Sequence, residues 1–117
     1  MLFTLFLLIF SFIYADLIRP ENEAALSYVH VPFEWEQEAD AVSYNLQISI
    51  QDSFNTLVVD ILEPTTVYIE KESLDWDDTY YWRVRSIYDS EDFGEWSEIS
   101  TFIIEDKTKE ILNLIKE

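Results

Sequence analysis

Carboxylate side chains are the reactive groups that this chain has in greatest number. Its 117 residues include 24 acidic and 7 basic ones, and the formal net charge is −17. Ca²⁺ requires about six to eight oxygen ligands that converge on one point. Two acidic segments, 36–40 and 89–92, connect predicted strands and would share one end of the fold described below. They supply the candidate calcium ligands Glu38, Asp40, Asp89, Glu91 and Asp92.

Solvated loops are the alternative interpretation of these acidic segments, because runs of charge usually lie on the surface. The same interpretation applies to the segment that contains Asp75, Asp77 and Asp78. An EF-hand is excluded, since its loop needs a glycine at the centre and none is present there. We therefore assign no metal and no cofactor, and keep the five carboxylates as candidates.

Other catalytic constellations lack the residues that would form them. The chain has no cysteine and one histidine, His30, which strand alternation places outward without a companion ligand. Gly94 is the only glycine, so no glycine-rich phosphate loop exists. Paired carboxylates can hydrolyse glycosides, but a small filled domain offers no cleft of about 300 Å³ or more for a sugar. The sequence predicts a protein that is not an enzyme.

Arginine and aromatic side chains form a second group of interest. Arg83 and Arg85 are predicted on the outer face of one strand, and Trp96 lies in the next. Stacking of Trp96 on either guanidinium would be a structural cation–π contact of about 0.5 to 2 kcal/mol. The alternative is a sugar-binding platform of Tyr81 and Trp96. Trp96 shares its strand parity with Phe102, a predicted core residue, so a bulge is needed to turn it outward.

Charge and the N-terminal segment limit the partners and the location. Nucleic acid and anionic membrane surfaces are excluded as partners, because binding to them requires lysine and arginine. Residues 1–15 carry no charged side chain and are shorter than the ~20 residues of a membrane span. Ala15 before Asp16 fits a secretory cleavage site. We expect a signal peptide, a secreted or cell-surface location and no membrane span after cleavage; the alternative is a core helix of a cytoplasmic protein.

Alternation of apolar and polar residues predicts β-strands in the rest of the chain. In 79–88 the inward row is Tyr80, Trp82 and Val84, and in 41–50 it runs from Val42 through Tyr44 to Ile50. The predicted strands are 17–20, 29–35, 41–50, 57–62, 65–70, 79–88 and 96–104. Seven short strands with polar connections are typical of an all-β sandwich.

A set of core positions in these strands resembles the fibronectin type III family, an immunoglobulin-like antiparallel β-sandwich of seven strands. The matching residues are Trp35, Tyr44, the tyrosine-corner pair Leu74 and Tyr80, and Trp82. The resemblance covers residues 17 to 104. The segments YYWRVRS and FGEWSEISTF are most similar to those of bacterial secreted domains of this family. It implies a Tyr80 hydroxyl bonded to the backbone at the corner. Segment 94–97 is similar to half of the Trp-Ser-x-Trp-Ser box of cytokine-receptor domains, in which arginines stack between aromatic rings.

The last residues change character. Ile111, Leu112 and Ile115 have helical spacing among lysine and glutamate, and Thr108 can cap a short helix. We divide the chain into a signal peptide (1–15), a fibronectin type III-like domain (16–106) and a helical linker or start of a further region (107–117).

The resemblance implies a non-catalytic extracellular binding or spacer module, with a protein or polysaccharide partner that the sequence does not identify. The alternative is an accessory domain of a secreted enzyme, a hydrolase or sulfotransferase, whose catalytic region lies C-terminal to residue 117. A calcium- or carbohydrate-binding domain is the third interpretation.

Overall fold

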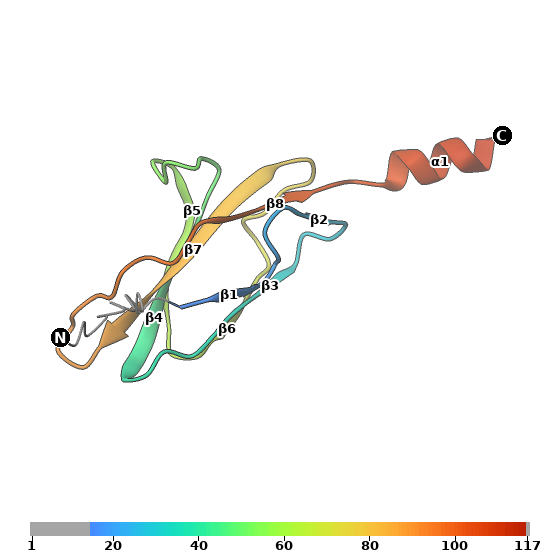
Figure 1. The fold of residues 1–117 in the computed structure, drawn as a ribbon. Coiled ribbons are helices and arrows are strands. Elements are labelled where there is room, and N and C mark those ends of the chain that lie inside the picture. The colour runs from blue at the N-terminus through green and yellow to red at the C-terminus, as the bar shows by residue number, and fades with distance from the viewer. Residues whose placement is uncertain (1–14, 117) are drawn as a thin grey trace, which may run out of the picture.

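Two β-sheets packed face to face, with one helix beyond them, make up the computed structural model, which describes residues 15–116 (Figure 1). The three-stranded sheet has the order β1 (Leu17–Arg19), β3 (Val31–Trp35), β6 (Val67–Glu70). The five-stranded sheet has the order β2 (Ala24–Leu26), β8 (Ser100–Ile104), β7 (Thr79–Tyr88), β4 (Ala41–Ser49), β5 (Leu57–Glu63). Helix α1 (Thr108–Lys116) follows. The expected all-β sandwich with a short helical tail is therefore present.

The core lies between the two sheets and is built from the inward rows of the strands. Phe33 of β3 meets Trp82 of β7 edge to face, with ring centroids 5.0 Å apart. Trp35 makes a similar contact with Tyr44 of β4 at 5.7 Å. Such pairs add to the stabilisation that burial of their apolar area gives. The fully buried core residues other than these include Leu46, Ile48, Tyr80, Val84, Phe102 and Ile104.

The strand count and the pairing differ from the prediction at the N-terminal side of the domain. The described residues form eight strands, not seven, and one pair is parallel, so the sandwich is not purely antiparallel. Pro20 has no N–H to donate and ends β1. The chain then crosses to the other sheet, where β2 runs parallel to β8 and Ala24 lies opposite Phe102. The Glu23 N–H donates to the Thr101 carbonyl at 2.7 Å, which fixes the crossing.

The predicted last strand, 96–104, begins only at Ser100. The segment before it follows β7 irregularly: Gly94 N–H donates to the Ser86 carbonyl, and Ser97 N–H donates to the Val84 carbonyl, each at 2.8 Å. The Ser97 hydroxyl also accepts the Val84 N–H at 3.0 Å. Trp96 therefore does not follow strand parity, and an irregular stretch replaces the expected bulge.

The inward row predicted for 41–50 is wrong at both of its ends. Val42 and Ile50 are exposed, whereas Tyr44, Leu46 and Ile48 between them are buried. The pairing of β4 with β7 shifts register between Ala41 and Ser43, and such a shift moves a side chain to the other face.

The two ends of the domain lie at the predicted boundaries with the signal peptide and with the helical tail. The predicted signal peptide lies outside the described residues except for Ala15, which is fully buried in the core cluster. Helix α1 points away from the sandwich, and none of its residues is buried (Figure 1). Among residues 15–116 no helix is long and apolar enough to cross a membrane.

Candidate functional site

The outer face of the five-stranded sheet carries a stack of alternating aromatic rings and guanidinium groups. The Cζ atom of Arg83 lies 4.1 Å from the ring centroids of both Phe54 and Trp96. The Cζ atom of Arg85 lies 4.3 Å from the Trp96 centroid and 3.9 Å from that of Phe93. Side chains two apart on one face of a strand are ~7 Å apart, so a ring fits between the two arginines. The order of the stack is Phe54, Arg83, Trp96, Arg85, Phe93.

Hydrogen bonds across the sheet fix both arginines in this stack. Arg83 donates from Nε and Nη2 to Gln47 Oε1 at 3.1 and 2.9 Å. Arg85 donates from Nε to Asn45 Oδ1 at 3.1 Å. Asn45 in turn donates to Asp60 Oδ1 at 2.8 Å. Each arginine lies directly opposite its β4 partner in the register of β4 with β7, whereas Asp60 of β5 lies opposite Gln47 and so reaches Asn45 diagonally. The network leaves the guanidinium planes free to stack.

The electrostatics of the stack reflect its partial burial. Burial lowers the pKa of Arg83 from its usual value, the charge of Arg85 lowers it further, and Asp60 opposes both. A guanidinium group carries its positive charge over a delocalised plane. The aromatic ring between Arg83 and Arg85 keeps two like charges apart and offers each an attractive face.

The expected contact of Trp96 with one arginine is thus made with both, and this bears on the sugar-binding alternative. A sugar stacks on an exposed ring face, but the guanidinium groups of Arg83 and Arg85 lie over the Trp96 ring at 4.1 and 4.3 Å. Tyr81 lies on the same face of β7 and is half-buried. The arrangement makes Trp96 a structural residue of the stack.

Phe54 was not identified from the sequence as part of this site. Its backbone has φ of 57°, in the left-handed region that few bulky residues adopt. This conformation in the β4–β5 loop directs the ring onto Arg83. The sequence signal was weak, because a left-handed turn is expected from glycine or asparagine.

The tyrosine corner lies at the opposite end of β7. The Tyr80 hydroxyl accepts the Asp75 N–H at 2.8 Å, and Leu74 beside it is buried. Burial raises the pKa of Tyr80; the hydrogen bond from Asp75 opposes this effect, and the charge of Asp78 adds to it. Tyr44 makes an analogous contact, since its hydroxyl accepts the Glu38 N–H at 3.0 Å. Two buried tyrosines therefore each fix the loop that precedes their own strand.

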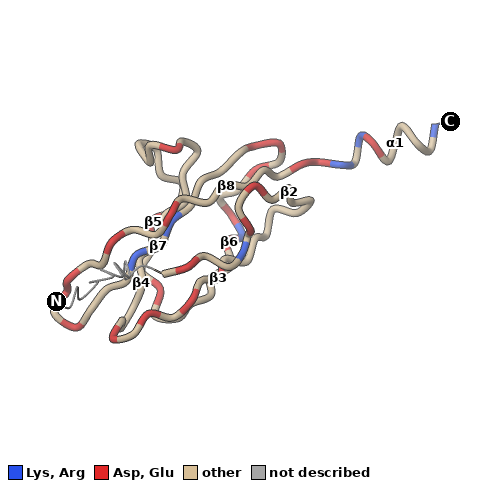
Figure 2. The backbone as a smooth tube through the Cα atoms, in the orientation of Figure 1, with Lys and Arg blue, Asp and Glu red and all other residues tan. Residues whose placement is uncertain are grey.

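The acidic side chains are spread over the loops rather than gathered at one point (Figure 2). Within residues 15–116 no group of three or more histidine, cysteine or acidic side chains is close enough to hold a metal ion. The candidates Glu38 and Asp40 lie in the β3–β4 loop, and Asp89, Glu91 and Asp92 lie in the β7–β8 loop. Burial raises the pKa of Glu38, and the charges of Asp16 and Glu36 raise it further.

Comparison with known proteins shows which solved structures have a similar fold. A scan against protein-family models found no match, and neither did a search of curated proteins. Among solved structures, a Fn3-like protein from Clostridium thermocellum is similar, with a TM-score of 0.59 and 16% identity over 78% of this chain and 91% of that one. A fibronectin type III domain derived from a human protein has a TM-score of 0.57 and 14% identity over 80% and 72% of the two chains. The chain has the fold of a fibronectin type III domain.

A third similar structure is much longer than this chain. The β-1,2-glucanase from Parabacteroides distasonis aligns with a TM-score of 0.60 and 16% identity over 88% of this chain, but only 14% of the enzyme. The fibronectin type III fold thus occurs as one small part of that protein. At these identities the likeness concerns the fold alone.

The expectation that this small domain offers no cleft of about 300 Å³ or more is wrong, because its surface carries a hollow. It has a volume of about 410 Å³ and lies beside Phe93, the last ring of the stack. It is at the edge of the sheet where β4 begins and where β5 and β7 end. Its lining includes the apolar side chains of Val42, Leu62 and Phe93, with Asp89 and Glu91 at its edge. The expectation failed because alternation assigned Val42 to the core, whereas its side chain is exposed.

Proposed function

We propose that this chain is a non-catalytic, extracytoplasmic binding or spacer module. The observation that carries the proposal is the stack from Phe54 to Phe93, which runs along the outer face of the five-stranded sheet. Phe54 belongs to the β4–β5 loop and Phe93 to the β7–β8 loop, and these loops lie at opposite ends of the antiparallel pair β4–β7. A sheet whose terminal loops are joined in this way is stiffened along its length, which suits a module that spaces or presents other surfaces.

Export is tested by expressing the full chain in a bacterium and measuring the mass of the protein outside the cytoplasm. The expected product starts at Asp16, because Ala15 fits the position before a cleavage site. Ala15 is a buried core residue, so the same measurement also identifies a cut placed before it. Retention of an uncut chain in the cytoplasm would contradict the extracytoplasmic location.

An accessory domain of a secreted enzyme is the second candidate function, and the β-1,2-glucanase favours it. If the chain serves such an enzyme, it is expected to bind the substrate polymer without cleaving it. Thermal unfolding with and without β-1,2-glucan is the direct measurement, because a ligand that binds only the folded state raises its stability. The Trp76→Ala and Trp96→Ala variants distinguish an exposed ring from the stacked one.

Calcium binding is tested in the same assay. Millimolar Ca²⁺ would raise the melting temperature above the value in NaCl of equal ionic strength if the loop carboxylates bind it. Equal melting temperatures would leave the acidic loops with a role in solubility.

A further inference from the structure

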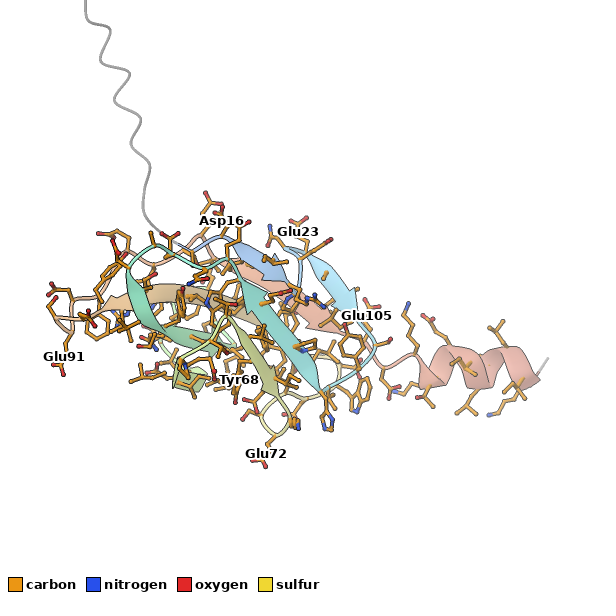
Figure 3. All side chains as sticks on the ribbon, turned by 90° about the horizontal axis from the view of Figure 1, so that it is seen from below. Asp16, Glu23, Tyr68, Glu72, Glu91 and Glu105 are labelled. Carbon is orange, nitrogen blue, oxygen red and sulfur yellow. The ribbon has the colours of Figure 1, made fainter. Side chains whose placement is uncertain are left out.

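Two apolar surfaces lie at opposite ends of the molecule, and neither is covered within the described residues. The first is the hollow at the end of β4, β5 and β7, in which Leu62 is 67% exposed and Phe93 is 54% exposed. The second is one face of α1, in which Leu114 and Ile115 are 75% and 73% exposed. Figure 3 shows Glu91, at the edge of the hollow, at the end of the molecule opposite α1.

The apolar face of α1 is continuous. At about 100° per residue, Leu114, Ile111, Ile115 and Leu112 fall on one stripe of the helix. At the start of the helix Asp106 Oδ1 accepts the Thr108 N–H at 2.8 Å, so Asp106, and not the predicted Thr108, supplies the side-chain acceptor there. A nine-residue helix with an exposed apolar stripe is marginal in water without a partner.

Charge distinguishes the helix from the rest of the chain. Helix α1 carries Lys109, Lys116 and one acidic residue, Glu110, and Lys107 precedes it, so lysine exceeds glutamate there although the chain as a whole has a net charge of −17. Figure 2 shows blue segments at both ends of α1 with a red segment between them, and red segments along the loops of the sandwich. The hollow carries Asp89 and Glu91 at its edge. The apolar character and the charges of the two surfaces are therefore complementary.

We propose that α1 of one molecule docks into this hollow of a second copy of the chain. The stripe of Ile111, Leu114 and Ile115 would replace water against Val42 and Leu62, and the lysines would face the acidic edge. A volume of about 410 Å³ lies within the ~300–1,000 Å³ of pockets that bind small molecules, so it accepts a few aliphatic side chains and not a whole helix.

A molecule cannot place α1 in its own hollow. Ile103 of β8 lies opposite Thr79, at the start of β7, whereas the hollow is lined by Ile87 and Tyr88 at its end. Nine strand residues separate these ends by ~30 Å. From Ile104, four extended steps to Thr108 and seven helical steps bring Ile115 roughly 25 Å away at most, still short of that separation. The contact is therefore between molecules and joins the helical end of one to the acidic end of the next.

Such a contact is heterologous, because it uses two different surfaces. Within residues 15–116 each molecule offers one such helix face and one such hollow, so association forms a closed ring or an open chain of molecules. The expected signature is a mass that rises with concentration above that of the monomer, and that reaches a plateau only if the ring closes.

The test uses three double variants of the full chain. The hollow variant is Val42→Thr with Leu62→Gln, the helix variant is Leu114→Gln with Ile115→Gln, and the matched control is Val67→Thr with Ile69→Gln. The control residues are 45% and 48% exposed on the three-stranded sheet. All substitutions are uncharged and fall on exposed side chains, and thermal unfolding verifies that each variant is folded.

Sedimentation velocity over a wide range of concentration gives the result. We expect the wild type and the control to associate, and the hollow and helix variants to be monomers. An equimolar mixture of these two monomers should form a heterodimer and nothing larger, since it restores one intact contact.

Three results would overturn the proposal. The first is a monomeric wild type at every concentration. The second is a hollow variant that associates like the wild type, as pairing of helices or of residues 1–14 would produce. The third is a mixture of the two variants that stays monomeric.

Discussion

The two faces of β7 are held in place by different physics, although they alternate along one strand. On the inner face Tyr80, Trp82 and Val84 are almost completely buried. On the outer face Arg83 and Arg85 are half-buried, and stacking and hydrogen bonds fix them. The inner face depends on apolar area removed from water. The outer face depends on the directions of hydrogen bonds and on the charges of the two arginines. These contacts order the side chains of a surface that water still reaches.

This difference explains the aromatic content of the chain. Of 117 residues, 16% are Phe, Trp or Tyr, more than the core alone requires. Phe54, Phe93 and Trp96 belong to the outer stack. Phe93 is exposed and still ordered by a guanidinium 3.9 Å from its centroid. Aromatic residues outside the core therefore need not indicate a binding platform.

The largest effect is expected from a break in the inner face. Trp82→Ala removes a fully buried ring that packs edge to face on Phe33 at 5.0 Å. The expected loss in the free energy of unfolding is about 3 to 5 kcal/mol, because a large cavity remains. Urea unfolding measures it. The matched control is Trp76→Ala, since Trp76 is 45% exposed, and a comparable loss there would contradict the role of burial.

A smaller effect is expected from the outer face. Trp96→Ala removes the ring between Arg83 and Arg85, and two cation–π contacts with it. At ~0.5 to 1 kcal/mol for each contact, the expected loss is about 1 to 2 kcal/mol. A double-mutant cycle with Arg83→Met isolates the contact. A coupling energy of zero in that cycle would mean that Trp96 acts through its area and not through the guanidinium groups.

The tyrosine corner tests whether the inner face also depends on a directional contact. Tyr80→Phe keeps the ring and deprives the Asp75 N–H of its acceptor. The expected loss is about 1 kcal/mol, measured by urea unfolding, because a partly buried donor loses its acceptor. Tyr81→Phe, on the outer face of the same strand, is the matched control. Similar losses in both variants would leave the hydroxyl of Tyr80 without a special role.

The pH dependence gives the finest test. Burial raises the pKa of Tyr80 and also that of Tyr68, to which the charge of Glu70 adds. The folded state then keeps phenolic protons that the unfolded chain releases near pH 10. The stability that these two tyrosines contribute is complete below about pH 10. It is lost as the pH rises through their higher pKa values in the folded state. Stability should therefore decline at alkaline pH.

Urea unfolding at a series of pH values measures this decline. It should be shallower in Tyr80→Phe than in wild type, and unchanged in Tyr81→Phe, which keeps Tyr80 and Tyr68. If stability declines as steeply with pH in Tyr80→Phe as in the wild type, groups other than Tyr80 cause the decline.

Much of the fold was predictable from local pattern, and the site only in part. Alternation predicted the inner row of β7 and the middle of β4, because a buried sheet face imposes period two. Trp96 was expected on an arginine, but not between two. Phe54 carried no sequence signal, since its position depends on a left-handed backbone in a loop. The hollow was missed because the register shift at Ala41 and Ser43 is a property of strand pairing.

The sequence by itself determined the class of the protein: an acidic β-sandwich with a tyrosine corner, without cysteine and with a helical tail. The strands, the acidity and the helix follow from composition and from periods of two and 3.6 residues, which act locally, whereas the tyrosine corner was expected from a family resemblance. Tertiary structure alone decided the parallel pairing of β2, the order of the stack from Phe54 to Phe93, and the separation of α1 from the hollow. Each depends on which distant segments meet, and such contacts leave no periodic trace in the chain.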